Sequence, residues 1–382
     1  MVPPANSLDP VALTQRLIAF DTVNPPGQEE PCARHLGELL EAAGFELTYV
    51  PMGPDRASLV ARKGSAGPQG PLVFTGHIDV VPLGGAPWTH GPFAGEIDGD
   101  RLYGRGSSDM KSGIAAFVCA AISEAHRAGE GLELVLIITA GEETGCHGAE
   151  SIVSAGLQGR AGALIVGEPT ANRPYVGHKG ALWLRCVACG KTAHGSMPEA
   201  GDNAVYKAAR ATHRLSLFAF DVPAHPTLGA PTLNVGTFHG GININSVPDR
   251  AAIEVDMRTI PGLAHASLRE RVAATVQEGM EIETLLDLPG VWTSPDQPWV
   301  QRTAAITSDV TGEPFELKTA TFFSDAAVLV PALGGVPALI LGPGEPQMAH
   351  QTDEWCSVTR IRQAQEIYRR LICDWAGAPL KA

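Results

Sequence analysis

The sequence lacks the features that mark a membrane protein, a nucleic-acid-binding protein or a disulfide-rich secreted domain. Its longest apolar runs, such as 134–140, are far shorter than the roughly 20 residues of a membrane span. Lys and Arg number 28 against 41 Asp and Glu, a net charge of −13, so no basic stripe is available for phosphates. The seven cysteines form no disulfide framework, and the first ten residues have neither the basic nor the apolar region of a secretory signal. We therefore expect a cytoplasmic protein that binds neither membrane nor nucleic acid.

What is present is typical of an enzyme-sized globular chain. At 382 residues, 44% hydrophobic and 18% charged, the sequence is long enough for two domains and a large buried core. The apolar strand 71–77 ends on His77, and Asp79 follows it. Alternate residues of an extended chain point to the same side, so Asp79 can orient the imidazole of His77 toward a metal. The alternative is that His77 and Asp79 only form a hydrogen bond at the end of the strand. This pair alone does not distinguish that alternative from a metal site.

Further acidic side chains stand at strand ends or beside a helix start. They are Asp109 before an alanine-rich helix at about 113–129, Glu142 and Glu143 after a strand at 132–139, and Glu168 after a strand at 163–166. For Asp109 a helix N-cap is the alternative. In open α/β sheets, ligands bind outside the carboxyl ends of the strands. Four carboxylates gathered there would repel one another, and bound cations would relieve that repulsion. We therefore predict a metal site.

A second domain is predicted within the first. Residues 177–293 show the order βαββαβ, with Gly/Pro-marked junctions at both ends, and this order is typical of a ferredoxin-like α+β domain. The α/β pattern of residues 1–176 resumes over 294–382. The predicted elements of the inserted domain are strands at 181–189, 232–239, 250–258 and 282–288, with helices at 202–218 and 265–281. We predict an α/β catalytic domain whose central sheet is flanked by helices and interrupted by this insertion.

Seven motifs in order carry a resemblance that covers nearly the whole chain. They read TGHIDVVP, GRGSSDMKSG, AGEETG, GEPT, AHGSMP with GDNA, NSVPD with DMR, and AHQTDE. In this respect the chain resembles the M20 family of metallopeptidases and deacylases, which includes acetylornithine deacetylase and succinyl-diaminopimelate desuccinylase. One such motif is weak evidence, whereas seven in the family's order are specific.

The resemblance implies a two-zinc site. His77 and Glu168 would hold one ion, Glu143 and His350 the other, and Asp109 would bridge them, with Co²⁺ or Mn²⁺ as possible substitutes. It also implies a cis peptide between Asp109 and Met110.

The resemblance further implies the residues that act on the substrate. Glu142 would be the general base and Asp79 would orient His77. His194 would cross from a partner subunit to the oxyanion, which implies a homodimer formed through the inserted domain, a dimerisation or lid domain. Asn245 and Arg258 match positions that bind a substrate carboxylate, with an interdomain ion pair as the alternative for Arg258.

The expected substrate is a small N-acyl amino acid. Glutamate at position 168 resembles the deacylases and carboxypeptidases of the family, and we favour a deacylase similar to acetylornithine deacetylase. A dipeptidase or carboxypeptidase using the same site is the alternative, and a non-catalytic binding protein a more distant one. The run Thr321-Phe-Phe-Ser-Asp325 departs from the related enzymes, and its two aromatic residues predict a larger, less polar acyl group or side chain.

Overall fold

The computed structural model describes residues 8–277 and 279–377 and divides into two compact units. Unit 1 contains the chain up to Gly177, Trp292–Ala320, and the chain from Ser324 onward. Unit 2 contains His178–Val291 and Thr321–Phe323. The predicted fold class, an α/β unit interrupted by an inserted α+β unit, is confirmed.

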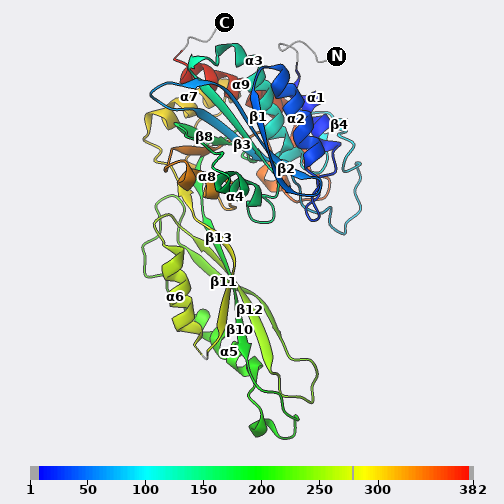
Figure 1. The fold of residues 1–382 in the computed structure, drawn as a ribbon, viewed down its shortest axis with the longest axis vertical. Helices are drawn as coiled ribbons and strands as arrows, with labels where there is room; N and C mark the ends of the chain where they lie inside the picture. Colours follow the sequence, from blue (N-terminus) through cyan, green and yellow to red (C-terminus); the bar gives the residue numbers. More distant parts are fainter. Residues whose placement is uncertain (1–7, 278, 378–382) are drawn as a thin grey trace. The chain divides into compact units, whose positions relative to one another are not determined.

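A ten-stranded mixed sheet forms the frame of unit 1 (Figure 1). Its main path runs β1-β2-β7-β3-β8-β16-β9-β14, while β6 pairs with β2 and β15 with β9. The strands are β1 (Glu46–Gly53), β2 (Arg56–Ala66), β3 (Leu72–His77), β6 (Glu130–Gly131), β7 (Glu133–Thr139), β8 (Ala163–Val166), β9 (Tyr175–His178), β14 (Val291–Trp292), β15 (Lys318–Ala320) and β16 (Ala338–Ile340).

The centre of this sheet consists of four parallel strands. β3 pairs in parallel with β7 and β8, and β8 pairs in parallel with β16. Their residues are almost entirely buried, as expected for strands covered by helices on both faces. Because the strands are parallel, their carboxyl ends meet at one edge of the sheet.

Helices cover both faces of the sheet. On one face α3 packs against α1 and α9, and α9 also packs against α7. On the other face α4 contacts α8 (Figure 1). Helix α1 begins at Pro10, because the Asp9 carboxylate caps its first turn and proline is favoured at the first helical position. The helices are α1 (Pro10–Ile18), α2 (Glu30–Ala42), α3 (Ser112–Ser123), α4 (His147–Ser154), α7 (Pro298–Thr311), α8 (Ala326–Ala332) and α9 (Val358–Trp375).

A small antiparallel sheet in unit 1 joins segments far apart in the sequence. Its order is β17-β5-β4, formed by β4 (Ile97–Asp98), β5 (Arg101–Tyr103) and β17 (Trp355–Ser357). In its register Trp355 lies opposite Tyr103 and Ser357 opposite Arg101. The segments that follow β5 and precede β17 are therefore neighbours.

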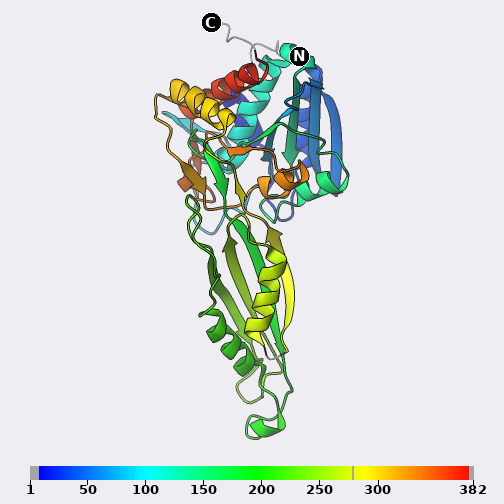
Figure 2. The same cartoon turned by 90° about the vertical axis from the view of Figure 1, so that its left-hand side faces the viewer.

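Unit 2 has the predicted order βαββαβ (Figure 2). Its two helices share one apolar core with the sheet. Its strands, ordered β11-β12-β10-β13, are β10 (Gly180–Cys189), β11 (Thr232–Gly240), β12 (Arg250–Thr259) and β13 (Glu281–Leu288), and its helices are α5 (Ala204–Leu215) and α6 (His265–Val276). Along β12 buried residues alternate with more exposed ones, so one face of the sheet packs against the helices. Helix α6 is shorter than the predicted 265–281.

Several elements follow from tertiary packing and were not predicted: β9, the small sheet, α4 and α8. Among the helices that the structure describes, none is long and apolar enough to cross a membrane.

Candidate active site at the carboxyl ends of the parallel strands

The parallel strands deliver acidic and imidazole side chains to one edge of the sheet. His77 is the last residue of β3, Glu142 and Glu143 follow β7, and Glu168 follows β8. His350 lies on the loop between β16 and β17. The sequence separates these residues by up to 273 positions, and the parallel sheet brings them together as predicted for an open α/β fold.

Two groups of these side chains could each hold a metal ion, and they share Asp109. In the first group, His77 Nε2 lies 3.2 Å from Asp109 Oδ1 and 3.6 Å from Glu168 Oε1. In the second, His350 Nε2 lies 3.1 Å from Glu143 Oε2 and 3.4 Å from Asp109 Oδ2. The donor atoms within each group are all within 4.8 Å of one another. Each oxygen of Asp109 therefore faces a different histidine, which is the arrangement of a carboxylate between two cations.

The two groups differ in exposure. The side chains of His77 and Glu168 are almost fully buried, whereas 52% of the His350 side chain is exposed. We call the group His77, Asp109 and Glu168 the buried position, and the group Asp109, Glu143 and His350 the exposed position.

The residues present fit a pair of divalent cations. Glu143 Oε1 is buried without a hydrogen-bond partner, although such an atom normally has one. Burial raises the pKa of Glu142 and Glu168 well above the usual range, and repulsion among the neighbouring carboxylates adds to the effect. Burial and Asp109 also raise the pKa of Glu143. Cations among these groups would supply the missing partner and offset the cost of burying so much negative charge.

The pKa values of the two histidines reflect the same excess of negative charge. Burial lowers the pKa of His77, but the Asp109 carboxylate in hydrogen-bond contact and the Asp79 carboxylate 3.6 Å away outweigh this and raise it well above the usual value. Hydrogen bonds to Asp109 and Glu143 raise the pKa of His350 to about 10. Imidazole and carboxylate donors in this combination suit zinc, cobalt or manganese.

Asp109 lies in the turn before α3 and does not cap that helix. The residue at the N-cap position of α3 is Lys111, which makes no side-chain capping bond. The Asp109–Met110 peptide is cis, as expected. The N-cap alternative for Asp109 is therefore wrong.

Asp79 contacts both His77 and the acidic turn. The nearest acceptor for His77 Nδ1 is the main-chain oxygen of Asp79 at 2.9 Å, while the carboxylate Oδ1 of Asp79 is 3.6 Å away. That carboxylate instead accepts from the backbone N–H groups of Glu142 at 3.1 Å and Glu143 at 3.3 Å, and from Asn24 Nδ2 at 2.9 Å. Asp79 thus contacts both the end of β3, through His77, and the turn that carries Glu142 and Glu143. The Asn24 contact was not predicted.

Glu142 is buried beside the two groups and belongs to neither. It is 5% exposed, and the Cys146 thiol lies 3.8 Å from its Oε1. The buried Asp325 interacts with the Cys146 thiol, and its Oδ2 accepts from Thr139 Oγ1. Burial raises the pKa of Asp325 to about 6. The sequence presents Asp325 only as the last residue of an unusual run, so its interaction with Cys146 near Glu142 was missed.

His147, which follows the acidic pair in sequence, does not point to the chemistry. It is exposed at the start of α4, where its Nδ1 lies 3.4 Å from Glu150.

In unit 2 the structure brings two of the predicted residues together and separates the third. His194 and Ser246 form an isolated bridge, and the N–H of Gly195 donates to the carbonyl of Asn245 at 2.7 Å. His194 and Asn245 are both exposed. They stand beyond the end of the sheet where β12 begins at Arg250, whereas Arg258 is near the other end of β12. Eight residues of extended chain span about 26 Å. His194 with Asn245 and Arg258 in one copy therefore cannot contact one small substrate.

Arg258 lies close to the aromatic ring of Trp183. Its guanidinium carbon is 5.9 Å from the ring centre of Trp183, and its Nε is 3.0 Å from Asp256 Oδ1. Trp183 also makes an edge-to-face contact with Phe323, at 6.3 Å between ring centres. One of the two aromatic residues singled out at 321–325 thus contacts the ring that lies beside the predicted carboxylate-binding arginine.

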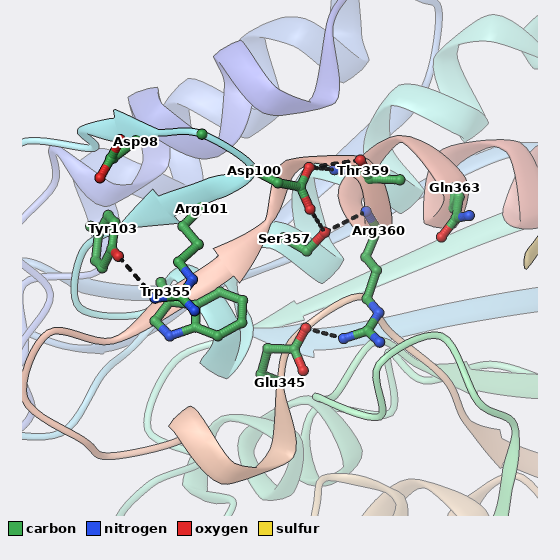
Figure 3. Close-up of a pocket in the computed structure, with 11 residues that line it drawn as sticks. Asp98, Asp100, Arg101, Tyr103, Glu345, Trp355, Ser357, Thr359, Arg360 and Gln363 are labelled. Atoms are coloured by element: carbon green, nitrogen blue, oxygen red, sulfur yellow. Dashed lines mark hydrogen bonds and ion pairs between the residues drawn. The ribbon is translucent and has the colours of Figure 1, made fainter.

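An open pocket of about 600 Å³ lies elsewhere on unit 1, against the small sheet (Figure 3). Its charged groups are largely engaged: Arg360 pairs with Glu345, Arg101 lies 4.5 Å from the Trp355 ring centre, and Asp100 accepts from Thr359. None of the predicted site residues lines it.

Comparison with known proteins identifies the family. Residues 73–374 match the family described as peptidase family M20/M25/M40. The probable succinyl-diaminopimelate desuccinylase of Staphylococcus epidermidis is 30% identical over 397 residues, covering 94% of this chain and 96% of that protein. The acetylornithine deacetylase of Myxococcus xanthus is 30% identical over 384 residues, covering 96% and 97%.

The fold has close counterparts among solved structures. An M20 family metallo-carboxypeptidase from Sulfolobus solfataricus superimposes with a TM-score of 0.79 at 19% identity, covering 96% of this chain and 99% of that one.

The chain belongs to peptidase family M20/M25/M40 and is a hydrolase of that metal-dependent family. The resemblance inferred from the seven motifs is confirmed.

Proposed function

We propose that this protein is a two-zinc amidohydrolase that removes the acyl group from an N-acyl amino acid. The observation that carries the proposal is the pair of metal-binding groups sharing Asp109, with the buried Glu142 beside them. The named relatives, a desuccinylase and a deacetylase, support an acyl amino acid as the substrate class.

In this proposal some residues of unit 1 bind the metal ions and another transfers the proton. His77, Glu168 and Asp109 would hold one zinc ion, and Asp109, Glu143 and His350 the other. When bound, such a pair polarises the amide carbonyl and makes water a better nucleophile at neutral pH. Glu142 accepts the proton of the attacking water and delivers it to the leaving amine. Burial among carboxylates raises the pKa of Glu142, which suits a group that must both take up and release a proton.

The residues of unit 2 supply substrate contacts. We assign Arg258 to the free carboxylate of the amino acid, because a guanidinium can bind a carboxylate through two parallel hydrogen bonds. Trp183 and Phe323 beside it offer apolar surface for a bulky group. This supports a substrate larger and less polar than acetylornithine.

His194 would hydrogen-bond the oxyanion and Asn245 the substrate, both from a second copy of the chain. Their separation from Arg258 within unit 2 supports this division, because all three residues serve one substrate only if two copies contribute. A homodimer through unit 2 would also cover its apolar surface: β11 is an edge strand, and exposed apolar side chains surround it. These side chains are Met197, Tyr206, Phe238, Ile242 and Ile244.

A cytoplasmic location fits the state of the thiols. All seven cysteines are free, and six of them are buried. A reducing compartment keeps such thiols unpaired.

A small substrate panel tests the function. Zinc-loaded protein is assayed with acetyl, succinyl and benzoyl derivatives of several amino acids, and with dipeptides of the same side chains. We expect turnover of the N-acyl amino acids, with the bulky apolar members preferred. Preference for dipeptides would favour the alternative, an M20 dipeptidase or carboxypeptidase, and bulky apolar acyl groups as the poorest substrates would overturn the assignment of Trp183 and Phe323.

A further inference from the structure

The turn that carries Asp109 is held by a buried carboxylate outside both metal-binding groups. Glu354 is fully buried, and its Oε1 accepts from the backbone N–H groups of Ser108 at 2.8 Å and Asp109 at 2.9 Å. Its Oε2 accepts from the N–H of Gly106 at 2.9 Å and from Arg105 Nη1 at 2.7 Å. Four donors thus fix one carboxylate, and three of them belong to the turn before α3.

The partner of Glu354 holds the loop that carries His350. Arg105 is 1% exposed, and its Nη1 donates to the carbonyl of Gln351 at 3.2 Å. Its Nη2 lies 3.5 Å from the carbonyl of His350 and 3.3 Å from that of Pro82. One guanidinium therefore joins the His350 loop to Glu354, and Glu354 joins both to the Asp109 turn.

The His350 loop needs such support. His350 has a φ of 64°, a left-handed backbone conformation that residues other than glycine rarely adopt, and Asp353 has a φ of 54°. Strained positions of this kind persist only when the surrounding structure fixes them. The side chain of His350 is half exposed and receives little packing support of its own.

The small sheet holds Glu354 and Arg105 close together. Glu354 immediately precedes β17 and Arg105 comes two residues after β5, and these strands pair with each other. Ser108 Oγ donates to the carbonyl of Trp355 at 2.7 Å. Figure 3 shows residues of the paired strands β5 and β17, where Arg101 lies over Trp355 and Ser357 caps α9.

We propose that Glu354 and Arg105 form a positioning clamp that sets the affinity of the exposed position for its metal ion. The clamp acts through the backbone, by fixing Asp109 and His350 relative to each other, and touches neither substrate nor reacting atoms. His77 and Glu168 are held by the ends of β3 and β8, so the buried position depends on the clamp only through Asp109. Loss of the clamp should therefore weaken metal binding at the exposed position more than at the buried position. This inference rests on the proposed two-metal function.

The test is a metal titration of Glu354→Gln. The substitution keeps the shape of the side chain but turns an amide NH₂ toward backbone N–H groups or toward Arg105, so at least one contact becomes donor against donor. Metal-free protein is titrated with Zn²⁺ by calorimetry, and with Co²⁺ by visible absorption. We expect wild type to bind two ions. In the variant the second ion should bind about 10- to 100-fold more weakly while the first stays within a few-fold of wild type.

Two further variants separate positioning from general stability. Arg105→Lys keeps the charge but loses the forked contacts to the carbonyls of His350 and Gln351, and it should weaken the same ion. Glu124→Gln is the matched control, because Glu124 is a buried carboxylate of unit 1 that pairs with Arg127 and Arg369 away from the site. It should lower the melting temperature without changing either metal affinity.

The outcomes are distinct. If wild type binds fewer than two ions at saturation, the proposed function fails and the clamp fails with it. If wild type binds two ions and both clamp variants do the same with unchanged affinities, the clamp alone is overturned. Activity restored to Glu354→Gln by excess Zn²⁺, with KM unchanged, would support the clamp, because a lasting structural defect would not respond to metal.

Discussion

The two units of this protein place their functional residues in opposite ways. Unit 1 collects residues from five separated segments into one cluster at the ends of four parallel strands. Unit 2 spreads its three predicted residues over the length of a four-stranded sheet, with His194 and Asn245 beyond one end and Arg258 near the other. The proposed function therefore draws its chemical groups from unit 1 alone and its unit 2 contacts from two copies of the chain.

The largest expected effect tests the chemistry of unit 1. Glu142→Gln should lower kcat by about 10²- to 10⁴-fold, because the amide cannot accept a proton from water. Metal content, measured by elemental analysis, should stay at two ions per chain because Glu142 belongs to neither position. Activity close to wild type would remove Glu142 from the role of base.

The next effect tests whether unit 2 works across two copies. His194→Ala should lower kcat by about 10²- to 10³-fold, the usual loss for one oxyanion donor. Mixed dimers of Glu142→Gln and His194→Ala chains contain one site in which both residues are intact. Random mixing should therefore restore about a quarter of wild-type activity. No recovery above the separate variants would show that each copy uses its own His194.

A pH prediction concerns the segment where unit 2 begins. His178 is fully buried, its Nδ1–H donates to the carbonyl of Lys179 at 2.8 Å, and Nε2 has no partner. Burial lowers the pKa of His178 from 6.5 to about 4. Between these values the unfolded chain binds the proton and the folded chain does not, so stability falls as the pH drops through this window.

The loss amounts to roughly 3 kcal/mol when complete, at about 1.4 kcal/mol per pH unit. Urea unfolding of metal-free protein at pH 7 and pH 4.5 measures it. His178→Gln should lose less stability between the two pH values than wild type. An equal loss in both proteins would mean that His178 does not contribute to the acid sensitivity.

The smallest effect sharpens the role of Arg258. Arg258→Ala should lower kcat/KM for free-acid substrates by about 10- to 100-fold, mostly through KM, because one charge-assisted contact is lost. Amide-capped substrates should be affected far less. Arg185→Ala is the control, since Arg185 forms ion pairs with Glu254 and Glu283 on the same sheet. Equal losses on both substrate classes would point to a structural ion pair with Asp256.

The difference between the units also shows what the sequence can predict. Four residues of the two metal-binding groups, His77, Asp109, Glu143 and Glu168, were candidates from the sequence pattern, because each stands at the end of an apolar strand or beside a helix start and parallel strands bring such ends together. His350 was implied only by the family resemblance, through the motif AHQTDE. The order of elements in unit 2 was predicted because alternating and helical periodicities are local.

The residues that were missed depend on long-range packing. Glu354 lies in the quoted motif AHQTDE, yet only the fold shows that it faces the backbone of Ser108 and Asp109, 245 or more positions away. Asp325 reaches Thr139 across 186 positions. No periodicity or spacing signals such a contact. A buried polar residue in a motif that also carries a metal-ligand candidate is the best available hint.

The most direct test of the central claim is anomalous diffraction from crystals grown with Zn²⁺. We expect two peaks in each chain, one beside His77 and Glu168 and the other beside Glu143 and His350, with Asp109 contacting both. A single peak, or peaks away from these residues, would contradict the two-metal site and the hydrolytic mechanism built on it.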